Sequence, residues 1–269
     1  MKITVFLLII LFSVTYCLAE DSDTGKLSDM EQELNTSDAD NDHDENDNDE
    51  CELEDGNFFL ELFRTLTYYL FIGVPFEDEA RQDFLWGFSF NEYPYSPDSH
   101  GAYDVYGEKT FRLNLSTVYI HFNEDLQGNS LQGNLNFTPF FKLEGELIRL
   151  KEDLQNSTDQ MDIYDIYLDY IRFRDENIVW WWGLGAKIIQ REHTHTAFSI
   201  TTGWEFYPFK PMSVNVSMNS AFFHSKLATE IDCNLRLYIY NFYLQTGYLR
   251  ESVGSESIQG ISAGLGVNF

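Results

Sequence analysis

The sequence lacks a hydrophobic run long enough to cross a membrane as a helix. The apolar run from Ile3 to Val14 falls short of the roughly 20 residues that a spanning helix needs, and no other stretch is long and apolar enough. Basic residues are scarce as well: 17 Lys and Arg face 44 Asp and Glu, which gives a net charge of −27. Because nucleic-acid phosphates bind cationic surfaces, we expect no nucleic-acid partner.

The N-terminus has the three-part pattern of a secretory leader. Lys2 precedes the apolar run, and Cys17-Leu18-Ala19 supplies small residues at a cleavage site. Residues 1–19 are therefore predicted to be a signal peptide that is cleaved after Ala19. Lipidation of Cys17 is the alternative, but Tyr16 stands where lipoproteins carry a small residue.

Cysteine is the third scarcity, with three residues in the whole chain. Only Cys51 and Cys233 remain after cleavage, and they are far apart in the sequence. An oxidising compartment would permit a disulfide between them. We expect both to be unpaired, because Cys51 lies in a segment that does not resemble a folded one.

That segment is strongly acidic. Residues 20–56 hold 17 Asp or Glu and one Lys, and almost no aromatic side chain. Such a composition cannot bury enough apolar surface to fold, which predicts a disordered tether. The tract Asp38–Asp49 alternates Asp with Asn and so is similar to loops that bind Ca²⁺, but the turn glycine and the bidentate Glu of those loops are missing. Weak Ca²⁺ association is the most that we expect, and no cofactor is predicted.

Residues 57–75 change character abruptly. Phe59, Leu62, Phe63 and Leu66 recur at helical spacing, and Pro75 can end a helix. We predict a short amphipathic helix that either anchors the chain on a membrane surface or plugs a channel mouth. The alternative is a first strand, because short aromatic-rich runs suit both structures.

From residue 84 onwards, apolar and polar residues alternate in segments of strand length. Membrane strands need about 9–11 such residues, apolar on the lipid side. Ten candidate strands satisfy this pattern, and the first is the weakest, so eight strands is the alternative count. The candidates are 84–92, 109–122, 133–149, 161–173, 177–191, 195–207, 212–223, 227–239, 242–250 and 259–269.

The last residues carry the most specific signal. Apolar Leu265 and Phe269 alternate with small or polar side chains, and the chain stops at an aromatic ring. This octet resembles the closing strand of small bacterial outer-membrane β-barrel proteins, in which the positions of Ser262, Gly264, Val267 and Phe269 form the signal that the barrel-assembly machinery reads. The resemblance implies an all-β fold, a transmembrane antiparallel barrel over 84–269, in the bacterial outer membrane. Outer-membrane lipid and the assembly machinery are the implied partners, and both termini are expected in the periplasm; the oligomeric state stays open.

The resemblance also orients the connections, with long loops outside and short turns inside. The tract 91–108 is then expected as the longest outer loop. Residues 123–132 fall on the inner side, where they are long for a turn.

Charged residues of both signs occupy the positions that alternation directs inward. A single sign would favour an ion-selective channel, whereas mixed signs favour a salt-bridged, largely filled lumen, since ten strands leave little space. A narrow pore is the alternative. The inward charges are Arg112, Lys142, Glu144, Glu146, Asp165, Asp169, Lys187, Glu205, Glu230, Asp232 and Arg236.

The sequence thus favours a barrel with a structural or surface-interaction role, and the alternative is a small transporter or narrow pore for ions or small solutes. We expect no enzyme. His193, His195 and Ser199 with Glu205 or Glu230 could be drawn as a catalytic set, but Ser and acidic residues are common on any lumen face. The two histidines lack an evident third metal ligand.

Overall fold

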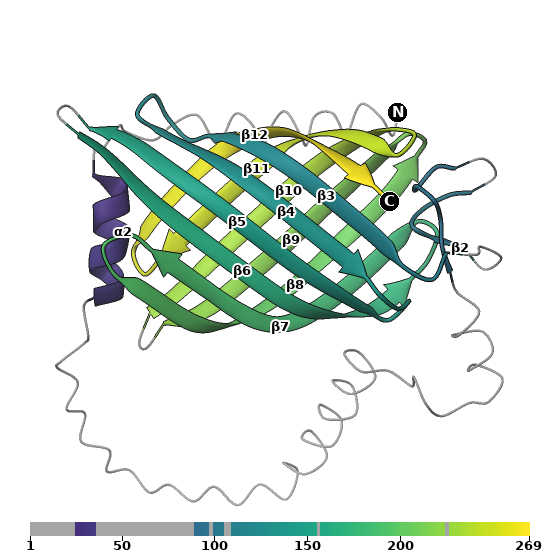
Figure 1. The fold of residues 1–269 in the computed structure, drawn as a ribbon, viewed down its shortest axis with the longest axis horizontal. Coiled ribbons are helices and arrows are strands. Elements are labelled where there is room, and N and C mark those ends of the chain that lie inside the picture. Colours follow the sequence, from purple (N-terminus) through teal and green to yellow (C-terminus); the bar gives the residue numbers. More distant parts are fainter. Residues whose placement is uncertain (1–24, 36–88, 97–98, 105–108, 155–156, 224–225) are drawn as a thin grey trace, which may run out of the picture.

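The computed structural model describes residues 25–35, 89–96, 99–104, 109–154, 157–223 and 226–269. Ten long antiparallel strands close into a barrel in chain order, from β3 to β12 (Figure 1). A two-stranded hairpin of β1 (Ser89–Phe90) and β2 (Tyr103–Asp104) and the helix α2 (Lys26–Asn35) lie at its opposite ends. The barrel strands are β3 (Arg112–His121), β4 (Leu126–Asn136), β5 (Phe141–Leu154), β6 (Ser157–Arg174), β7 (Ile178–Gln190), β8 (Thr194–Phe209), β9 (Met212–Phe223), β10 (Lys226–Ile239), β11 (Phe242–Val253) and β12 (Glu256–Asn268).

The barrel closes where β12 pairs with β3. Eight residue pairs form this seam, from Ile261 opposite His121 to Asn268 opposite Asn114. The β5–β6 ladder, by comparison, has fourteen pairs. Beyond the last seam pair, Phe269 and Leu113 exchange two backbone hydrogen bonds of 2.8 and 3.2 Å. All-antiparallel closure leaves the barrel without a free sheet edge.

The predicted fold class and the count of ten strands are confirmed, and the alternative of eight is wrong. The set of strands differs in one place. Of the candidate 84–92, the structure describes residues 89–92; there Ser89 and Phe90 pair with β2 rather than with a barrel strand, and 84–88 lie outside the described residues. The candidate 133–149 merges the end of β4, the turn 137–140 and most of β5. Alternation missed β4 because its outward face includes Gln127 and Asn129, which interrupt the apolar pattern.

Replacing the first candidate strand by β4 changes which loops lie at each end of the barrel. We call the end that holds Phe269 the C-terminal mouth and the other end the α2 mouth. The connection between β3 and β4 lies at the α2 mouth, so 123–132 is not an inner turn. The β1–β2 hairpin lies at the C-terminal mouth, where the His100 ring is 2.8 Å from the Tyr207 carbonyl oxygen and the Tyr95 hydroxyl bonds the Phe209 carbonyl. The described part of the tract 91–108 is therefore not an outer loop on the side opposite the C-terminus.

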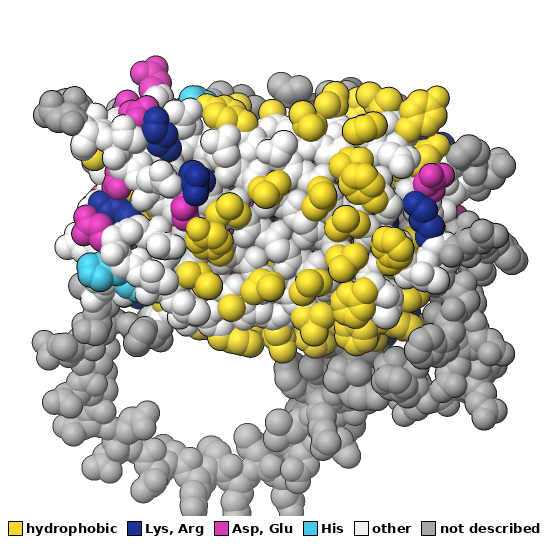
Figure 2. Space-filling model, in the orientation of Figure 1, with side chains coloured by type: hydrophobic (Ala, Val, Ile, Leu, Met, Phe, Trp, Pro, Cys, Tyr) yellow, Lys and Arg dark blue, Asp and Glu magenta, His cyan; other side chains and the backbone are white. Residues whose placement is uncertain are grey.

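Large apolar side chains cover the outer wall. Leu131, Ile166 and Leu265 each expose more than half of their surface. Figure 2 shows hydrophobic side chains spread as a band over the barrel wall, with charged residues at its two ends and most prominently near the α2 mouth. Aromatic rings line the C-terminal edge of the band: Trp180 stacks on Trp204 with centroids 5.1 Å apart and also meets Phe173. Within the described part of the chain, no helix has the length and hydropathy needed to cross a membrane.

Part of the acidic tether is ordered, contrary to the prediction of disorder for 20–56. Residues Lys26–Asn35 form α2, and its Leu27, Met30 and Glu31 are buried against the barrel. Their spacing of three and four residues places them on one helix face. The predicted signal peptide, the tract Asp38–Asp49, Cys51 and the predicted helix 57–75 lie outside the described residues. Cys233 is a free thiol on the outer wall.

Candidate functional site

The interior of the barrel is divided into three tiers along its axis. An apolar tier lies beneath α2, a charged tier occupies the middle, and an aromatic tier closes the C-terminal mouth. Each strand crosses all three, so its inward side chains change character along its length. In β3, for example, the inward side chains are polar at Arg112, Asn114 and Ser116. They become apolar at Val118 and Ile120, nearer the α2 mouth.

The apolar tier is a hydrophobic core inside the barrel. All ten barrel strands contribute side chains to it, including β12, which adds Ile258 near its start. Leu27 and Met30 of α2 are fully buried in it, and Leu34 packs against it. The inward members are Val118, Ile120, Leu126, Ile148, Leu150, Met161, Ile163, Ile189, Ala197, Ala221, Phe223, Ala228, Leu249, Val253 and Ile258. This tier leaves the α2 mouth packed with side chains.

Two buried glutamates fix α2 over this core. Glu152 of β5 accepts hydrogen bonds from the backbone N–H groups of Gly25, Lys26 and Leu27 at 2.8, 3.1 and 3.3 Å. These donors have no partner within the helix, and the positive end of the helix dipole favours a carboxylate there. Glu31 of the helix is the second buried glutamate, and its partners belong to the β7–β8 turn.

Glu31 binds that turn through both of its oxygens. It accepts the backbone N–H groups of Glu192 and His193 at 3.1 and 2.8 Å, and it pairs with the Arg191 guanidinium. At the helix C-terminus, Glu33 pairs with Lys226 at 3.2 Å and accepts from the Ser255 hydroxyl at 2.7 Å. The docking of α2 therefore depends on named charged partners as well as on apolar contact.

We expect acid to release α2. Burial raises the pKa of Glu31, but the His193 N–H and the Arg191 guanidinium outweigh it and hold that pKa below the usual 4.5. A depressed pKa means that Glu31 contributes its full stabilisation above about pH 4.5 and loses it as the pH falls through the lowered value. Hydrogen exchange of the α2 amides should accelerate in that acid range. A Glu31→Gln variant should exchange faster at neutral pH and should lack this acid step; an identical acid step in the variant would contradict the assignment.

Lys187 is the centre of the charged tier. Its ammonium group lies 3.2 Å from Asp165, 2.8 Å from Glu230 and 3.1 Å from Glu251, and all four side chains are almost completely buried. Tyr167 donates to Asp165 at 3.0 Å, which orients the carboxylate. These groups come from β6, β7, β10 and β11, so the cluster ties opposite walls of the barrel together.

A second ammonium group lies nearer the C-terminal mouth. Lys142 of β5 pairs with Glu144 on its own strand and with Asp169 at 3.1 Å. It also lies 4.0 Å from the centre of the Trp181 ring, a cation–π contact. Lys142 thereby links the charged tier to the aromatic one.

The aromatic tier closes the C-terminal mouth around Glu205. Arg236 pairs with Glu205 at 3.1 Å, and the hydroxyls of Ser213 and Tyr238 donate to the same carboxylate at 3.2 and 3.3 Å. Arg112 donates to the Asn268 side chain at 2.9 Å. Phe90, Tyr103, Ile171, Val179, Trp181 and Tyr207 form an apolar cluster that joins the β1–β2 hairpin to the barrel wall.

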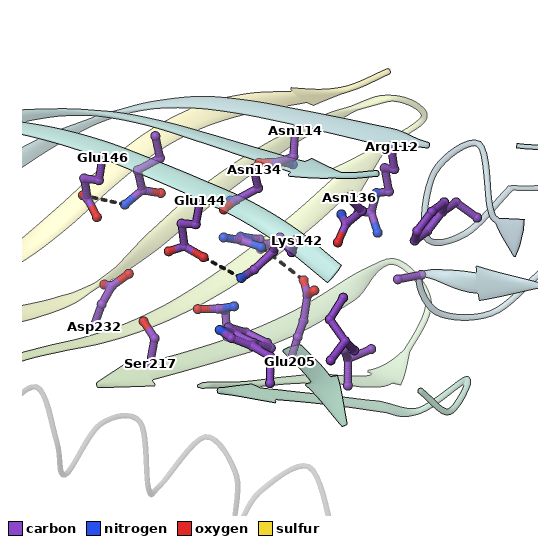
Figure 3. Close-up of a pocket in the computed structure, with 18 of the residues that line it drawn as sticks. Arg112, Asn114, Asn134, Asn136, Lys142, Glu144, Glu146, Glu205, Ser217 and Asp232 are labelled. Atoms are coloured by element: carbon purple, nitrogen blue, oxygen red, sulfur yellow. Dashed lines mark hydrogen bonds and ion pairs between the residues drawn. The ribbon is translucent and has the colours of Figure 1, made fainter. Parts of the chain in front are cut away.

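Between these tiers lies a cavity of about 70 Å³, enough for several water molecules. Its wall carries Glu144, Glu146 and Asp232, whose side chains converge on one space in Figure 3. It reaches Phe90 and Tyr103 of the β1–β2 hairpin. The cavity therefore opens towards the C-terminal mouth, and the apolar tier lies between it and α2.

The structure places all eleven predicted lumen charges on the inner side of the wall. Alternation missed Glu251 and Glu152, because β11 and β5 extend past the predicted strand ends at 250 and 149. It also missed the apolar tier. The signal was present in β5, where Ile148 and Leu150 are inward while Arg149 and Lys151 point outward. Such an inversion of the usual pattern marks the part of a strand that projects beyond the apolar band.

Three residues of the predicted assembly signal, Ser262, Gly264 and Val267, lie on β12, and Phe269 follows its last residue. Ser262 and Gly264 face the lumen, and Phe269 projects outward with 52% of its surface exposed. A Cβ at Gly264 would come within 2.3 Å of the Thr117 carbonyl oxygen, so the close approach of β12 to β3 requires glycine. Val267 pairs with Leu115 across the seam.

A charge at the terminal ring should impair assembly. We expect Phe269→Asp to slow folding into lipid vesicles and to lower the yield of heat-modifiable barrel, because the ring ends the closing strand. Phe242→Asp is the matched control, since Phe242 is an exposed aromatic that pairs with Val267 at the same mouth. Gel mobility against time gives both rates. Equal slowing in the two variants would show that rim hydrophobicity matters and that the terminal position does not.

The residues considered for catalysis do not come together. Ser199 is fully buried in the lumen, where it bonds Tyr167 at 2.9 Å and donates to the Ser220 carbonyl at 3.1 Å. His193 lies at the α2 mouth with its ring 3.6 Å from Glu31. Among the described residues, no hydrogen bond joins a histidine to Ser199. Glu31, Glu192 and His193 are close enough to hold a metal ion, but both oxygens of Glu31 already accept hydrogen bonds.

Comparison with known proteins finds similar solved structures but no matching sequence. No protein-family model matches it, and no curated protein sequence does. Solved structures of similar shape include two of the outer membrane protein Ail of Yersinia pestis, which have TM-scores of 0.35 and 0.28 and 10% and 14% identity. Both cover 60% of this chain, and this chain covers 100% and 97% of theirs.

The N-terminal β-barrel domain of Pseudomonas aeruginosa OprF is a third similar structure. It has a TM-score of 0.30 and 12% identity, and the match covers 59% of this chain and 97% of that domain. Scores this low assign neither a subfamily nor a residue role. The chain is a closed ten-stranded antiparallel barrel with an apolar outer wall, and its own geometry carries the functional assignment.

Proposed function

We propose that the chain is a bacterial outer-membrane β-barrel protein whose C-terminus faces the periplasm. Two observations support a membrane location: the closed barrel satisfies its backbone hydrogen bonds internally, as lipid demands, and large apolar side chains cover its outer wall. The predicted signal peptide and terminal octet agree with this location. With Phe269 in the periplasm, α2 lies on the outer side, so the expectation of a periplasmic N-terminus is not carried over to residues 26–35.

We further propose that the protein has a structural role or mediates interactions at the cell surface, and that it is neither a transporter nor an enzyme. The observation that carries this proposal is the packed α2 mouth. Leu27 and Met30 are fully buried on an apolar core that fills the lumen beneath them. Water and ions cannot cross such a core without opening it, because interiors of this kind are packed as densely as crystals.

A narrow pore is the second candidate, and the cavity favours it. The cavity occupies the charged tier and extends to the β1–β2 hairpin, so the apolar tier with α2 closes one side of it and the aromatic tier the other. In this alternative, α2 is a removable plug.

Conductance across planar lipid bilayers separates the two candidates. The full chain should give no steady current, and neither should the double variant Glu31→Ala, Glu152→Ala, which loses the two glutamates that fix α2. Asp153→Ala is the matched control, because Asp153 is an exposed acidic residue at the end of the same strand as Glu152. Current from the double variant alone would identify a plugged pore. Current from the unmodified chain would refute the proposed closed role.

A further inference from the structure

Two carboxylates in the lumen have no basic partner. Glu146 of β5 accepts hydrogen bonds from Ser130 at 2.6 Å and from Gln132 at 2.9 Å. Asp232 of β10 accepts one from the Asn234 amide. Within the described ranges, neither forms an ion pair with Lys or Arg, and both line the cavity. Figure 3 shows the two carboxyl groups directed into the same space.

The lysines and Arg236 are already engaged with carboxylates, and Arg112, which also lines the cavity, donates to the Asn268 side chain. Lys142 pairs with Glu144 and Asp169, and Lys187 pairs with three carboxylates. Arg236 pairs with Glu205. Charges withdrawn from water cost several kcal/mol each unless an opposite charge accompanies them. The two lysine clusters already hold more carboxylates than cations, and Glu146 and Asp232 add two carboxylates that no ion pair among the described residues compensates.

A third side chain that lines the cavity has an unpaired oxygen. Asn219 is 4% exposed and lines the cavity, and its amide nitrogen donates to Glu230 at 3.0 Å. Its amide oxygen accepts no hydrogen bond. A buried acceptor without a donor is costly. The amide oxygen needs a hydrogen-bond donor and the two carboxylates need positive charge, and a cation that carries water in the cavity supplies both.

We propose that the cavity binds one hydrated divalent cation of the Mg²⁺ class between Glu146 and Asp232. Such an ion balances both carboxylates, and the donors on offer are oxygens, which hard cations prefer. Glu146 and Asp232 do not belong to a compact three-ligand cluster; among the described residues that cluster is Glu31 with Glu192 and His193. Two carboxylates leave most coordination positions of the ion to water. Mg²⁺ commonly keeps several waters while one or two carboxylates hold it, and the cavity has room for them.

The ion would enter from the C-terminal mouth. The cavity wall includes Phe90, Ala102 and Tyr103 of the β1–β2 hairpin, whereas the apolar tier blocks the opposite approach. The proposal concerns the lumen alone and stands whether the barrel is a closed structural protein or a plugged pore.

The test uses Mn²⁺ as a paramagnetic substitute for Mg²⁺, with the full chain folded in detergent micelles at neutral pH. We expect the double variant Glu146→Gln, Asp232→Asn to lose one class of bound Mn²⁺ in electron paramagnetic resonance titrations. Mg²⁺ should displace that class from the unmodified chain. Asp153→Asn is the matched control, because it removes one exposed carboxylate outside the lumen. Ions held loosely by the acidic N-terminal segment are common to all variants, so they cancel when the Mn²⁺ bound by a variant is subtracted from that bound by the unmodified chain.

Thermal unfolding gives a second readout. Mg²⁺ should raise the unfolding temperature of the unmodified chain relative to EDTA, and the double variant should show no such rise, because its neutral amides need no counter-ion. Retention of all bound Mn²⁺ by the double variant would overturn the proposal. So would an unmodified chain that ignores Mg²⁺ and is stabilised by acid, since protons would then neutralise the two carboxylates.

Discussion

Replacing Lys187 with methionine is expected to destabilise the barrel by about 3–5 kcal/mol, the range for removing one partner of a buried ion pair. Methionine retains the length of the side chain and removes its charge. Asp165, Glu230 and Glu251 would then face one another in the interior without the ammonium group that lies about 3 Å from each. Urea unfolding in lipid vesicles measures the change in the free energy of unfolding.

Arg149→Met is the matched control for this prediction. Arg149 also forms an ion pair, with Asp162 at 2.9 Å, but 54% of its side chain is exposed. Exposed pairs contribute about 0–1 kcal/mol, so this variant should unfold almost like the unmodified chain. A small loss for Lys187→Met as well would show that water reaches the cluster and that the lumen is wetter than its burial indicates.

Ile166→Arg is expected to cost about 2–4 kcal/mol, the range for a cation at the bilayer midplane on the outer wall of a barrel. Ile166 lies near the middle of β6 and exposes 54% of its surface. In water an arginine at such an exposed site would be tolerated. The expected loss therefore depends on lipid around the barrel, and equilibrium unfolding from vesicles measures it.

Gln160→Arg tests the same face of the same strand. Gln160 lies six residues from Ile166 towards the α2 mouth, beside the exposed Lys151. There the cost should fall to about 0–1 kcal/mol, because a cation near the interface stays hydrated. Equal costs at both positions would place Ile166 outside the hydrocarbon layer and would contradict the membrane assignment.

Alternation predicted strands well where both faces were distinct. β9 has the bounds expected from the sequence, because apolar Val214 and Val216 alternate with polar Ser213 and Asn215 over its whole length. β4 was missed because its outward positions include Gln127, Asn129 and Gly133, which hide the apolar face. A strand of this kind is recognised only when its neighbours leave an unfilled place in the barrel.

The inward charges could be predicted because alternation fixes their direction. Their partners could not, because Lys187 meets Glu230 and Glu251 across the lumen, 43 and 64 residues further along the chain. α2 was hidden for the same reason. Its own composition is acidic, and the groups that order it, Glu152 and Arg191, follow it by more than a hundred residues. Local composition describes the isolated segment and says little about contacts made after the barrel closes.

The β3–β12 seam gives the barrel a mechanical weak line. Its ladder of eight residue pairs is short beside the fourteen of β5–β6, and Gly264 and Gly266 contribute no side chain to it on the lumen side. Force or heat that parts the wall meets least resistance there. Opening along this line turns the barrel into a curved sheet with two exposed edges, so the last step of closure and the first step of rupture share the same few hydrogen bonds.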